Sequence, residues 1–248
     1  MKQLAAKLIS NKKVKGNYWH CVIDAPFIAK KASPGQFLNI KLSDSFDPLL
    51  RRPFSIHNCS AKKVEILYEV LGKGTQILSQ KKPGETLDII GPIGKGFDYK
   101  AGSGQIIVAG GMGVAPLVFL AKVLAKSKPR VFLGARTKEQ ILCAKELKAL
   151  GLYVEVSTDD GTAGFKGKIT ELLRNNISSG MIYACGPKAM LKAVAEFSSG
   201  LKIPAQLSLE EHMSCAIGVC LGCVVKTKAG LKRVCKEGPV FNAADLIW

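Results

Sequence analysis

The stretch Gln105-Ile-Ile-Val-Ala-Gly-Gly-Met-Gly-Val-Ala-Pro116 decides the fold class of this chain. Its first five residues, mostly apolar, predict a buried strand, and the glycines that follow predict a turn. Pro116 suits the first turn of a helix, which we expect over residues 117–125. A buried strand that turns directly into a helix is the repeating unit of a parallel sheet with helices on its faces.

The same alternation continues downstream of this stretch. Apolar runs that predict strands are separated by longer segments with helical periodicity. Right-handed crossovers between such strands give a doubly wound parallel α/β domain. The expected strands span 130–133, 153–157 and 181–184, and the expected helices span 139–150, 169–175 and 188–197.

Two loops at the carboxyl ends of these strands suit a dinucleotide, because ligands bind there in an open α/β sheet. Gly110, Gly111 and Gly113 allow close backbone approach to a pyrophosphate, although Gly-Gly-x-Gly-x-Ala-Pro differs from the usual Gly-x-Gly-x-x-Gly pattern. Cys185, after the last strand, can lie beside a nicotinamide. An inert buried thiol is an equally good interpretation of Cys185.

A third loop bears on the choice between NAD and NADP. Asp159 and Asp160 follow another strand and suit a free ribose hydroxyl, whereas they would repel a 2′-phosphate. Arg136 and Lys138, after the preceding strand, argue for NADP. The two carboxylates lead us to expect NAD.

Residues 1 to about 98 have the pattern of an all-β unit. Short alternating runs are separated by turn signals such as Ser33-Pro34-Gly35 and Lys82-Pro83-Gly84. We expect a small antiparallel β-barrel, and three units in all: residues 1–100, 101–204 and 205–248. The six expected strands span 4–9, 18–23, 36–42, 54–57, 64–70 and 86–90.

Two segments of the β unit have chemical interest. Arg51-Arg52-Pro53-Phe54-Ser55 places a guanidinium and a hydroxyl where both can address a phosphate-bearing ligand with a flat ring. Gly72-Lys73-Gly74-Thr75 opens a short helix over 75–79, whose backbone N–H groups and Thr75 hydroxyl can receive a pyrophosphate. Taken alone, a basic pair is more often solvated surface, and such a loop is more often a turn with an N-cap.

Four of the eight cysteines lie near the end of the chain, in the segment Cys215-Ala-Ile-Gly-Val-Cys220-Leu-Gly-Cys223 and at Cys235. A C-x4-C-x2-C…C order is typical of [2Fe-2S] ligation. Zinc is the main rival, but zinc sites usually present two C-x2-C pairs and only one is found here. Inert buried thiols are a third interpretation. A hairpin that turns near Ala229-Gly230 would return Cys235 to the other three.

Composition sets further limits. The chain has 248 residues, 47% of them hydrophobic, and a formal net charge of +17. It lacks a signal-peptide pattern and any apolar run of about 18 residues, so we expect a cytoplasmic protein without a membrane span. The lysines are dispersed and lack interleaved aromatic residues, so we expect solvated surface that attracts an anionic dinucleotide or acidic partner, with no nucleic-acid binding. The isolated Cys21, Cys59 and Cys143 are expected to be buried or half-buried.

The order of these motifs, Arg-Pro-Phe-Ser, Gly-Lys-Gly-Thr, Gly-Gly-x-Gly-x-Ala-Pro, Cys-Gly-Pro and a C-terminal four-cysteine loop, resembles the ferredoxin reductase superfamily. More narrowly, the sequence around the cysteines, Glu210-Glu-His-Met-Ser-Cys and Val234-Cys-Lys-Glu-Gly-Pro-Val-Phe, is similar to the electron-transfer subunits of NAD-dependent dihydroorotate dehydrogenases. His212 and Ala216 depart from that family's pattern, in which arginine and glycine are common.

The resemblance implies cofactors and site residues. Cys215, Cys220, Cys223 and Cys235 would be the ligands of a [2Fe-2S] cluster. The Gly110 loop and the Cys185 region would bind the nicotinamide cofactor NAD, a diffusible acceptor. The contacts to FAD would come from Arg52, Pro53, Phe54, Ser55, Leu67, Tyr68, Glu69, Gly74 and Thr75.

The resemblance also implies a function in pyrimidine biosynthesis. Electrons from dihydroorotate would reach an FMN on a separate catalytic subunit, cross the cluster to FAD, and leave as a hydride to NAD. The complex would be a heterotetramer with two copies of each subunit, and this chain needs no acid–base catalyst of its own. The alternatives are a reductase subunit of a hydrogenase, a sulfide dehydrogenase or a ferredoxin:NADP oxidoreductase. A zinc-stabilised nucleotide- or nucleic-acid-binding protein is an alternative from another class.

Overall fold

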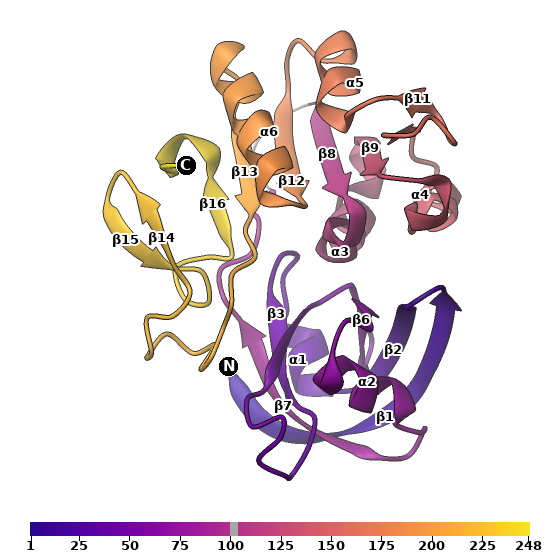
Figure 1. Cartoon of the computed structure of the whole chain (residues 1–248), viewed down its shortest axis with the longest axis vertical. Helices are drawn as coiled ribbons and strands as arrows, with labels where there is room; N and C mark the ends of the chain where they lie inside the picture. Colours follow the sequence, from indigo (N-terminus) through magenta and orange to yellow (C-terminus); the bar gives the residue numbers. More distant parts are fainter. Residues whose placement is uncertain (100–103) are drawn as a thin grey trace.

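A computed structural model describes residues 1–99 and 104–248 of the chain. A curled antiparallel sheet lies at one end of the molecule and a parallel sheet flanked by helices at the other (Figure 1). The C-terminal segment runs along one side of both. The expected boundary between residues 100 and 101 lies outside the described residues.

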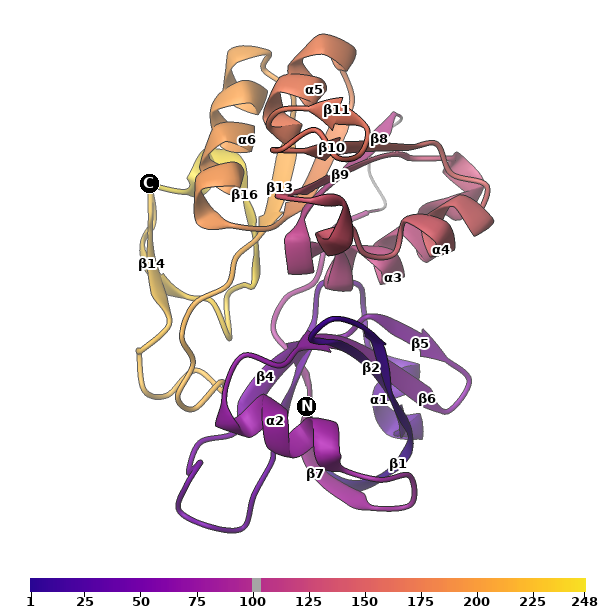
Figure 2. The ribbon, with the colours of Figure 1, turned by 45° about the vertical axis from the view of Figure 1, so that its right-hand side comes forward.

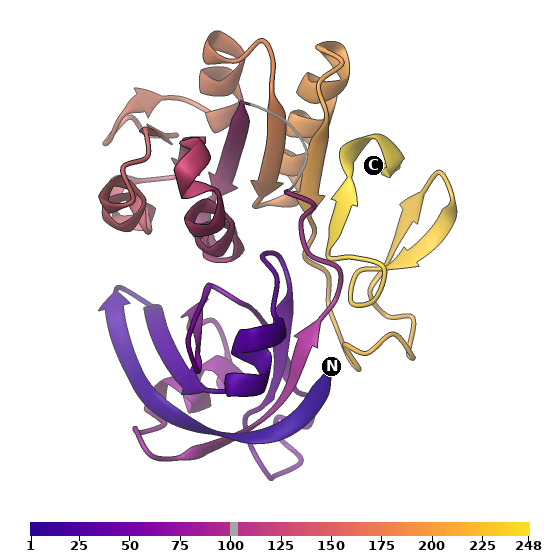
Figure 3. The same cartoon turned by 180° about the vertical axis from the view of Figure 1, so that it is seen from behind.

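The N-terminal sheet contains seven strands in the order β4-β3-β7-β1-β2-β6-β5. All six expected strands are present and β5 is an additional one, too short at three residues to show a pattern. The sheet curls around helix α1 (Pro26–Lys31), whose Ile28 is fully buried, and α2 (Lys73–Gln80) lies nearby (Figures 2 and 3). The strands are β1 (Lys2–Lys15), β2 (Tyr18–Asp24), β3 (Phe37–Lys41), β4 (Arg52–Ser55), β5 (Asn58–Ser60), β6 (Lys63–Glu69) and β7 (Thr86–Ile93).

The second sheet has the order β11-β10-β9-β8-β12-β13-β16, in which all strands but β16 are parallel. The expected doubly wound arrangement is confirmed. Helices α3 (Val114–Leu124) and α4 (Ala144–Ala149) contribute to one core, and α5 (Ile169–Asn176) and α6 (Lys188–Gly200) to another. The strands are β8 (Gln105–Gly110), β9 (Arg130–Ala135), β10 (Val154–Thr158), β11 (Phe165–Lys166), β12 (Met181–Cys185), β13 (Ala205–Ser208) and β16 (Val240–Asn242).

The prediction of a helix over 139–150 is wrong for the first half of that range. A 3-10 turn covers Lys138–Gln140, and the α-helix begins only at Ala144. Cys143 interrupts the two with a φ of 59°, the left-handed region that favours glycine over residues with a Cβ. An apolar periodicity does not reveal such a break.

The C-terminal segment belongs partly to the parallel sheet. β13 pairs with β12, and β16 returns antiparallel to β13 from thirty-odd residues further along the chain. The hairpin expected around Ala229-Gly230 is confirmed as β14 (Val224–Thr227) and β15 (Gly230–Arg233). Among the described residues no helix is long and apolar enough to cross a membrane.

Candidate functional site

The four C-terminal cysteines are free thiols that meet in two pairs. The thiol of Cys215 contacts that of Cys220, and the thiol of Cys235 contacts that of Cys223. Among the described residues, one group of three other side chains has potential metal-ligand atoms within 4.8 Å of one another. None of these four cysteines belongs to that group. Two pairs of thiolates suit two metal ions, as in a [2Fe-2S] cluster, better than the single tetrahedral ion of a zinc site.

Backbone N–H groups turn toward these sulfurs. Val219 and Cys220 each donate to Sγ of Cys215 at 3.4 Å, and Gly222 donates to Sγ of Cys220 at 3.5 Å. Burial acts against ionisation, but the backbone N–H groups around Cys215 lower its pKa to about 6. A thiolate is the form that binds a metal, so the loop is prepared for ligation before any ion arrives.

Cys223 and Cys235, the inner pair, have a more buried environment. Burial, followed by contact with Cys223, raises the pKa of Cys235 to about 12, and the backbone N–H of Cys235 donates to Sγ of Cys223 at 3.4 Å. Both residues are almost fully buried, at 2% and 1% exposure. They pack against Phe37 of β3 and Ile93 of β7, so the barrel forms the inner wall of this centre.

The ligand loop has a tightly wound backbone. Ala216 has a φ of 57° and is buried, which explains why glycine suits this position. Gly218 has a φ of 85°, and its carbonyl oxygen accepts a bond of 2.7 Å from Nη1 of Arg233. Glu237 holds that guanidinium through Nε at 3.0 Å and through Nη2. The pair thus ties the loop to the hairpin that carries Cys235.

Cys215 and Cys220, the outer pair, lie at the surface beside apolar side chains. Cys220 is exposed and Cys215 half-buried. Ile217, Val219 and Leu221 lie between the cysteines in the sequence and are 40%, 74% and 59% exposed. Three exposed apolar side chains around a metal centre form a surface suited to contact with another protein.

One strand separates this centre from the Arg-Pro-Phe-Ser segment. Asn39 of β3 donates from Nδ2 to the carbonyl oxygen of Cys215 at 3.4 Å. In the sheet, Asn39 is paired with Pro53 of β4, and Phe37 with Ser55. Asn39 is 1% exposed, and its Oδ1 atom has no hydrogen-bond partner among the described residues. Neither Asn39 nor Arg233 belongs to a motif, so no sequence pattern selects them.

The two arginines of the Arg-Arg-Pro-Phe-Ser segment have different environments. Arg51 donates to the carbonyl oxygen of Asp88 at 2.8 Å and pairs with its carboxylate at 2.5 Å, so it has a structural role. The side chain of Arg52 lies against the first turn of α2, which contains Gly74. A Cβ added to Gly74 would lie 3.3 Å from Nε of Arg52. The fold therefore brings Arg52 and the Gly-Lys-Gly-Thr turn together, as a phosphate-bearing ligand requires.

Other residues expected at this place are partly used by the fold itself. The Thr75 hydroxyl accepts from the N–H groups of Leu71 and Gly72 at 3.0 and 3.2 Å, which shapes the turn. The first helical bond is donated by Gln76, so the earlier N–H groups of α2 face outward for an anion. Phe54 and Tyr68 are buried and meet edge to face at 5.8 Å.

Burial raises the pKa of Glu69 on β6, which lies half-buried next to Tyr68 and Leu67. Leu67 and Tyr68 are themselves buried, at 5% and 3% exposure.

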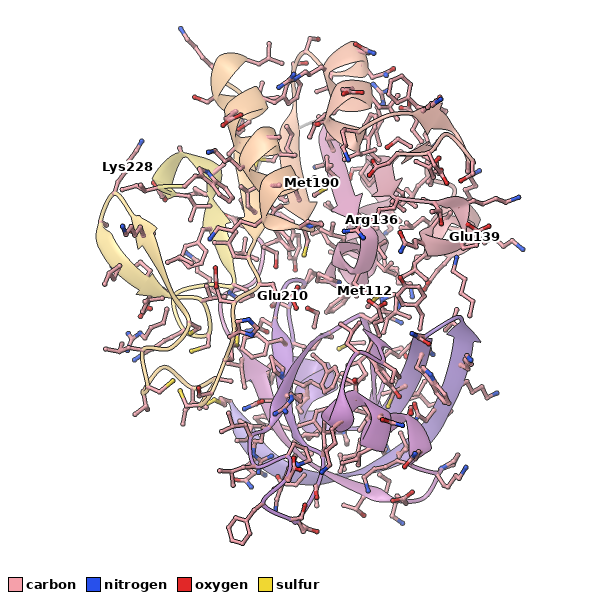
Figure 4. All side chains as sticks on the ribbon, in the orientation of Figure 1. Met112, Arg136, Glu139, Met190, Glu210 and Lys228 are labelled. Carbon is pink, nitrogen blue, oxygen red and sulfur yellow. The ribbon has the colours of Figure 1, made fainter. Side chains whose placement is uncertain are left out.

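The two glycine-containing loops at the end of the parallel sheet pack directly on one another. A Cβ on Gly113 would lie 2.2 Å from the carbonyl oxygen of Cys185, and one on Gly110 would lie 2.9 Å from Pro187. Gly111 has a φ of 53°. Burial, followed by the charge of Glu210, raises the pKa of Cys185 to about 12. Glu210 begins the segment leading to the cysteine loop and lies between the two sheets (Figure 4).

The carboxylates expected at a ribose are engaged within their own loop. Asp159 pairs with Lys168 at 2.8 Å, and Asp160 accepts from the hydroxyl of Thr162 at 2.7 Å. The hydrogen bonds that Asp160 accepts, of which those from Thr162 have the largest effect, lower the pKa of Asp160. A ribose would have to compete with these partners for the two carboxylates.

Comparison with solved structures agrees with this geometry. The structure of an NADH-dependent reduced ferredoxin-NADP oxidoreductase superimposes with a TM-score of 0.84 and 28% identity, covering 98% of this chain and 90% of that one. A ferredoxin NADP+ reductase from Neisseria gonorrhoeae with bound FAD and NADP has the same fold, with a TM-score of 0.71 and 17% identity, covering 84% of this chain and all of that one. Fold and site together define an oxidoreductase subunit of the ferredoxin reductase type.

Sequence comparison narrows the class. Residues 210–247 match the iron-sulfur cluster binding domain of dihydroorotate dehydrogenase B, and residues 107–196 match an oxidoreductase NAD-binding domain. The dihydroorotate dehydrogenase B (NAD(+)) electron transfer subunit of Desulforamulus reducens is 42% identical, covering 98% of this chain and 97% of the relative. A homolog of that subunit from Aquifex aeolicus is 41% identical, with 99% and 98% covered. The chain belongs to the family of dihydroorotate dehydrogenase B electron transfer subunits.

Proposed function

We propose that this chain carries electrons from an FMN-containing, dihydroorotate-oxidising subunit to NAD in pyrimidine biosynthesis. The observation that carries the proposal is the pairing of the four thiols, with one pair at an apolar surface and the other against the barrel. A [2Fe-2S] cluster and FAD, when bound, supply the one-electron and two-electron carriers that such a transfer requires. The residues of this chain bind the carriers, orient them and exclude water.

We assign the binding residues as follows. Iron would be held by Cys215, Cys220, Cys223 and Cys235. The loops of Gly110, Gly111, Gly113 and Cys185 would position the nicotinamide cofactor NAD, with backbone N–H groups free to approach its phosphates. Arg52 of β4 would hold the flavin pyrophosphate together with Gly74 and Thr75 in the first turn of α2. The rest of FAD would contact Pro53, Phe54 and Ser55 of β4 and Leu67, Tyr68 and Glu69 of β6.

The partner would dock over the outer thiol pair. Ile217, Val219 and Leu221 would be buried by it, and an apolar patch around a carrier keeps water away from the path between subunits. We further propose a heterotetramer with two copies of each subunit and a division into units 1–100, 101–204 and 205–248 for FAD, NAD and the cluster. We place the protein in the cytoplasm, where cysteines remain reduced and available to iron.

The test is co-expression of the chain with the FMN-containing subunit. The purified complex should contain iron, sulfide, FAD and FMN, and should reduce NAD when dihydroorotate is added. Cys220→Ser should abolish this activity and retain NADH-dependent reduction of a dye, because the flavin site is intact. A colourless, zinc-containing protein would contradict the proposal, and so would NAD reduction that requires ferredoxin and ignores dihydroorotate.

A further inference from the structure

A second group of metal-ligand side chains lies between the two domains, away from the four-cysteine centre. It consists of His57, from the turn between β4 and β5, and of Cys143 and Glu146, from the start of α4. One ligand atom of each lies within 4.8 Å of those of the other two. All three line a cleft formed by the barrel on one side and by α4 and β10 on the other.

The imidazole of His57 is oriented for ligation. Its side chain is 3% exposed, and its Nδ1 lies 2.9 Å from the carbonyl oxygen of Ala115. A carbonyl oxygen only accepts, so Nδ1 carries the proton and Nε2 is turned toward the other two side chains. The gap from Nε2 to Glu146 is 3.5 Å, longer than the hydrogen bond of a close ion pair. Ligating histidines commonly use this arrangement, with the second nitrogen bound to a backbone carbonyl.

The other two side chains are also fixed. The second carboxylate oxygen of Glu146 accepts from Nζ of Lys122 at 2.9 Å, which leaves the oxygen nearer His57 for a cation. Cys143 adopts a φ of 59°, an unfavourable backbone conformation for a residue with a Cβ, and this conformation sets the direction of its thiol at the helix start. Strain of this kind persists where the surrounding structure enforces it.

We propose that His57, Cys143 and Glu146 form a zinc-binding site that joins the two domains. Nitrogen, sulfur and carboxylate ligands together are the donor set of Zn2+, and water from the cleft would complete a tetrahedron. Ligand atoms around zinc are about 3.3–3.8 Å apart, given bond lengths of roughly 2.0–2.3 Å, so side-chain shifts of about 1 Å would close the site. The Cys143 thiol loses its proton to the solvent as the Zn–S bond forms, and no electron is transferred.

The site has a mechanical consequence. His57 belongs to the barrel, whereas Cys143 and Glu146 belong to the α/β domain. An ion held by all three therefore fixes one domain against the other, and zinc would stabilise the folded chain in proportion to its binding.

The test uses the purified complex with its iron-sulfur centre loaded, so that the four C-terminal cysteines are occupied. After exposure to Zn2+ and removal of the excess, metal analysis should find one zinc per chain with the iron content unchanged. Cys143→Ser and His57→Gln should each lower zinc affinity at least tenfold, whereas Cys59→Ser, a half-buried thiol elsewhere in the barrel, should not. Mg2+ should not compete, because it prefers oxygen ligands.

A second readout does not depend on activity. Zinc should raise the midpoint of thermal unfolding of the wild type and leave that of both variants unchanged, provided that their flavin and iron contents are normal. Equal zinc retention by the wild type and both variants would overturn the assignment. So would a wild-type protein that retains none. The site does not rest on the proposed function, so these results are independent of the dihydroorotate assay.

Discussion

Asn39 links the four-cysteine loop to the Arg-Pro-Phe-Ser segment: its side chain donates to the carbonyl oxygen of Cys215, while its backbone is paired with Pro53. A single strand, β3, thus lies between β4, which carries the Arg-Pro-Phe-Ser segment, and Cys215, the first of the four clustered cysteines. The side-chain bond is 3.4 Å long and partly buried. It fixes the position of the cysteine loop relative to the barrel.

Asn39→Ala should loosen the cysteine loop. The Cys215 carbonyl would lose its buried donor, which costs about 1 kcal/mol. Iron should be released at a lower temperature, as followed by the loss of cluster absorbance, while flavin content stays normal. Asn58→Ala is the matched control, because Asn58 donates to Glu65 at 2.8 Å on the far side of the barrel. Equal iron loss in both variants would show a general loss of stability instead.

Arg233→Met should lower the reduction potential of the centre. The guanidinium is a fixed positive charge beside the inner thiols, and positive charge favours the reduced, more negative state. The bond to Gly218 would also be lost, at a cost of about 1–2 kcal/mol. A potentiometric titration followed by electron paramagnetic resonance measures the effect. Arg233→Lys keeps the charge and should restore most of the potential; a potential unchanged in both variants would refute the electrostatic role.

Val219→Glu should weaken association with the catalytic subunit. Val219 is 74% exposed next to the outer thiols, and a carboxylate there would be desolvated on docking. The dissociation constant should rise about tenfold or more, corresponding to roughly 1.4 kcal/mol. Val123→Glu places the same charge on α3, at a residue 44% exposed, and serves as the control. Sedimentation of the mixed subunits measures both, and a stronger effect at residue 123 would place the interface elsewhere.

The two arginines at 51 and 52 should separate stability from flavin binding. Arg52→Met should reduce FAD affinity about 10- to 100-fold, the equivalent of a lost charged hydrogen bond, with little change in unfolding of the flavin-free chain. Arg51→Met should lower the unfolding free energy by about 1 kcal/mol and retain FAD, because Arg51 holds Asp88. Flavin fluorescence and denaturant unfolding measure the two quantities. The reverse pattern would indicate that Arg51, and not Arg52, binds the flavin phosphate.

Asp88 should make stability depend on pH in the acid range. Burial opposes its ionisation, but hydrogen bonds from Arg51 and Gln3 lower its pKa below the ordinary 3.8. A depressed pKa contributes stability above the unfolded value, and this contribution disappears as pH falls below about 3.8. Asp88→Asn should therefore cost about 0.5–1 kcal/mol at neutral pH and nothing in strong acid. A constant difference between the two proteins at all pH values would contradict this.

Local sequence was sufficient wherever the determining interaction is itself local. The strand, glycine turn and helix of residues 105–125 follow from apolar periodicity and from backbone freedom at glycine, and the cysteine spacing indicates iron because ligand order reflects how a short loop wraps. The hairpin that returns Cys235 is also encoded by adjacent residues.

The remaining features depend on contacts between distant parts of the chain. The short strand β13 forms because it pairs with β12, and β16 forms because it pairs with β13, not because of their own composition. Arg51 and Arg52 are chemically identical, and only the tertiary structure places Arg51 against Asp88 and Arg52 against α2. The approach of Cys143 to His57, with ligand atoms within 4.8 Å of each other, likewise exists only because the fold brings two distant segments together. Burial and opposing charges across the fold decide these roles, and neither is present in a local pattern.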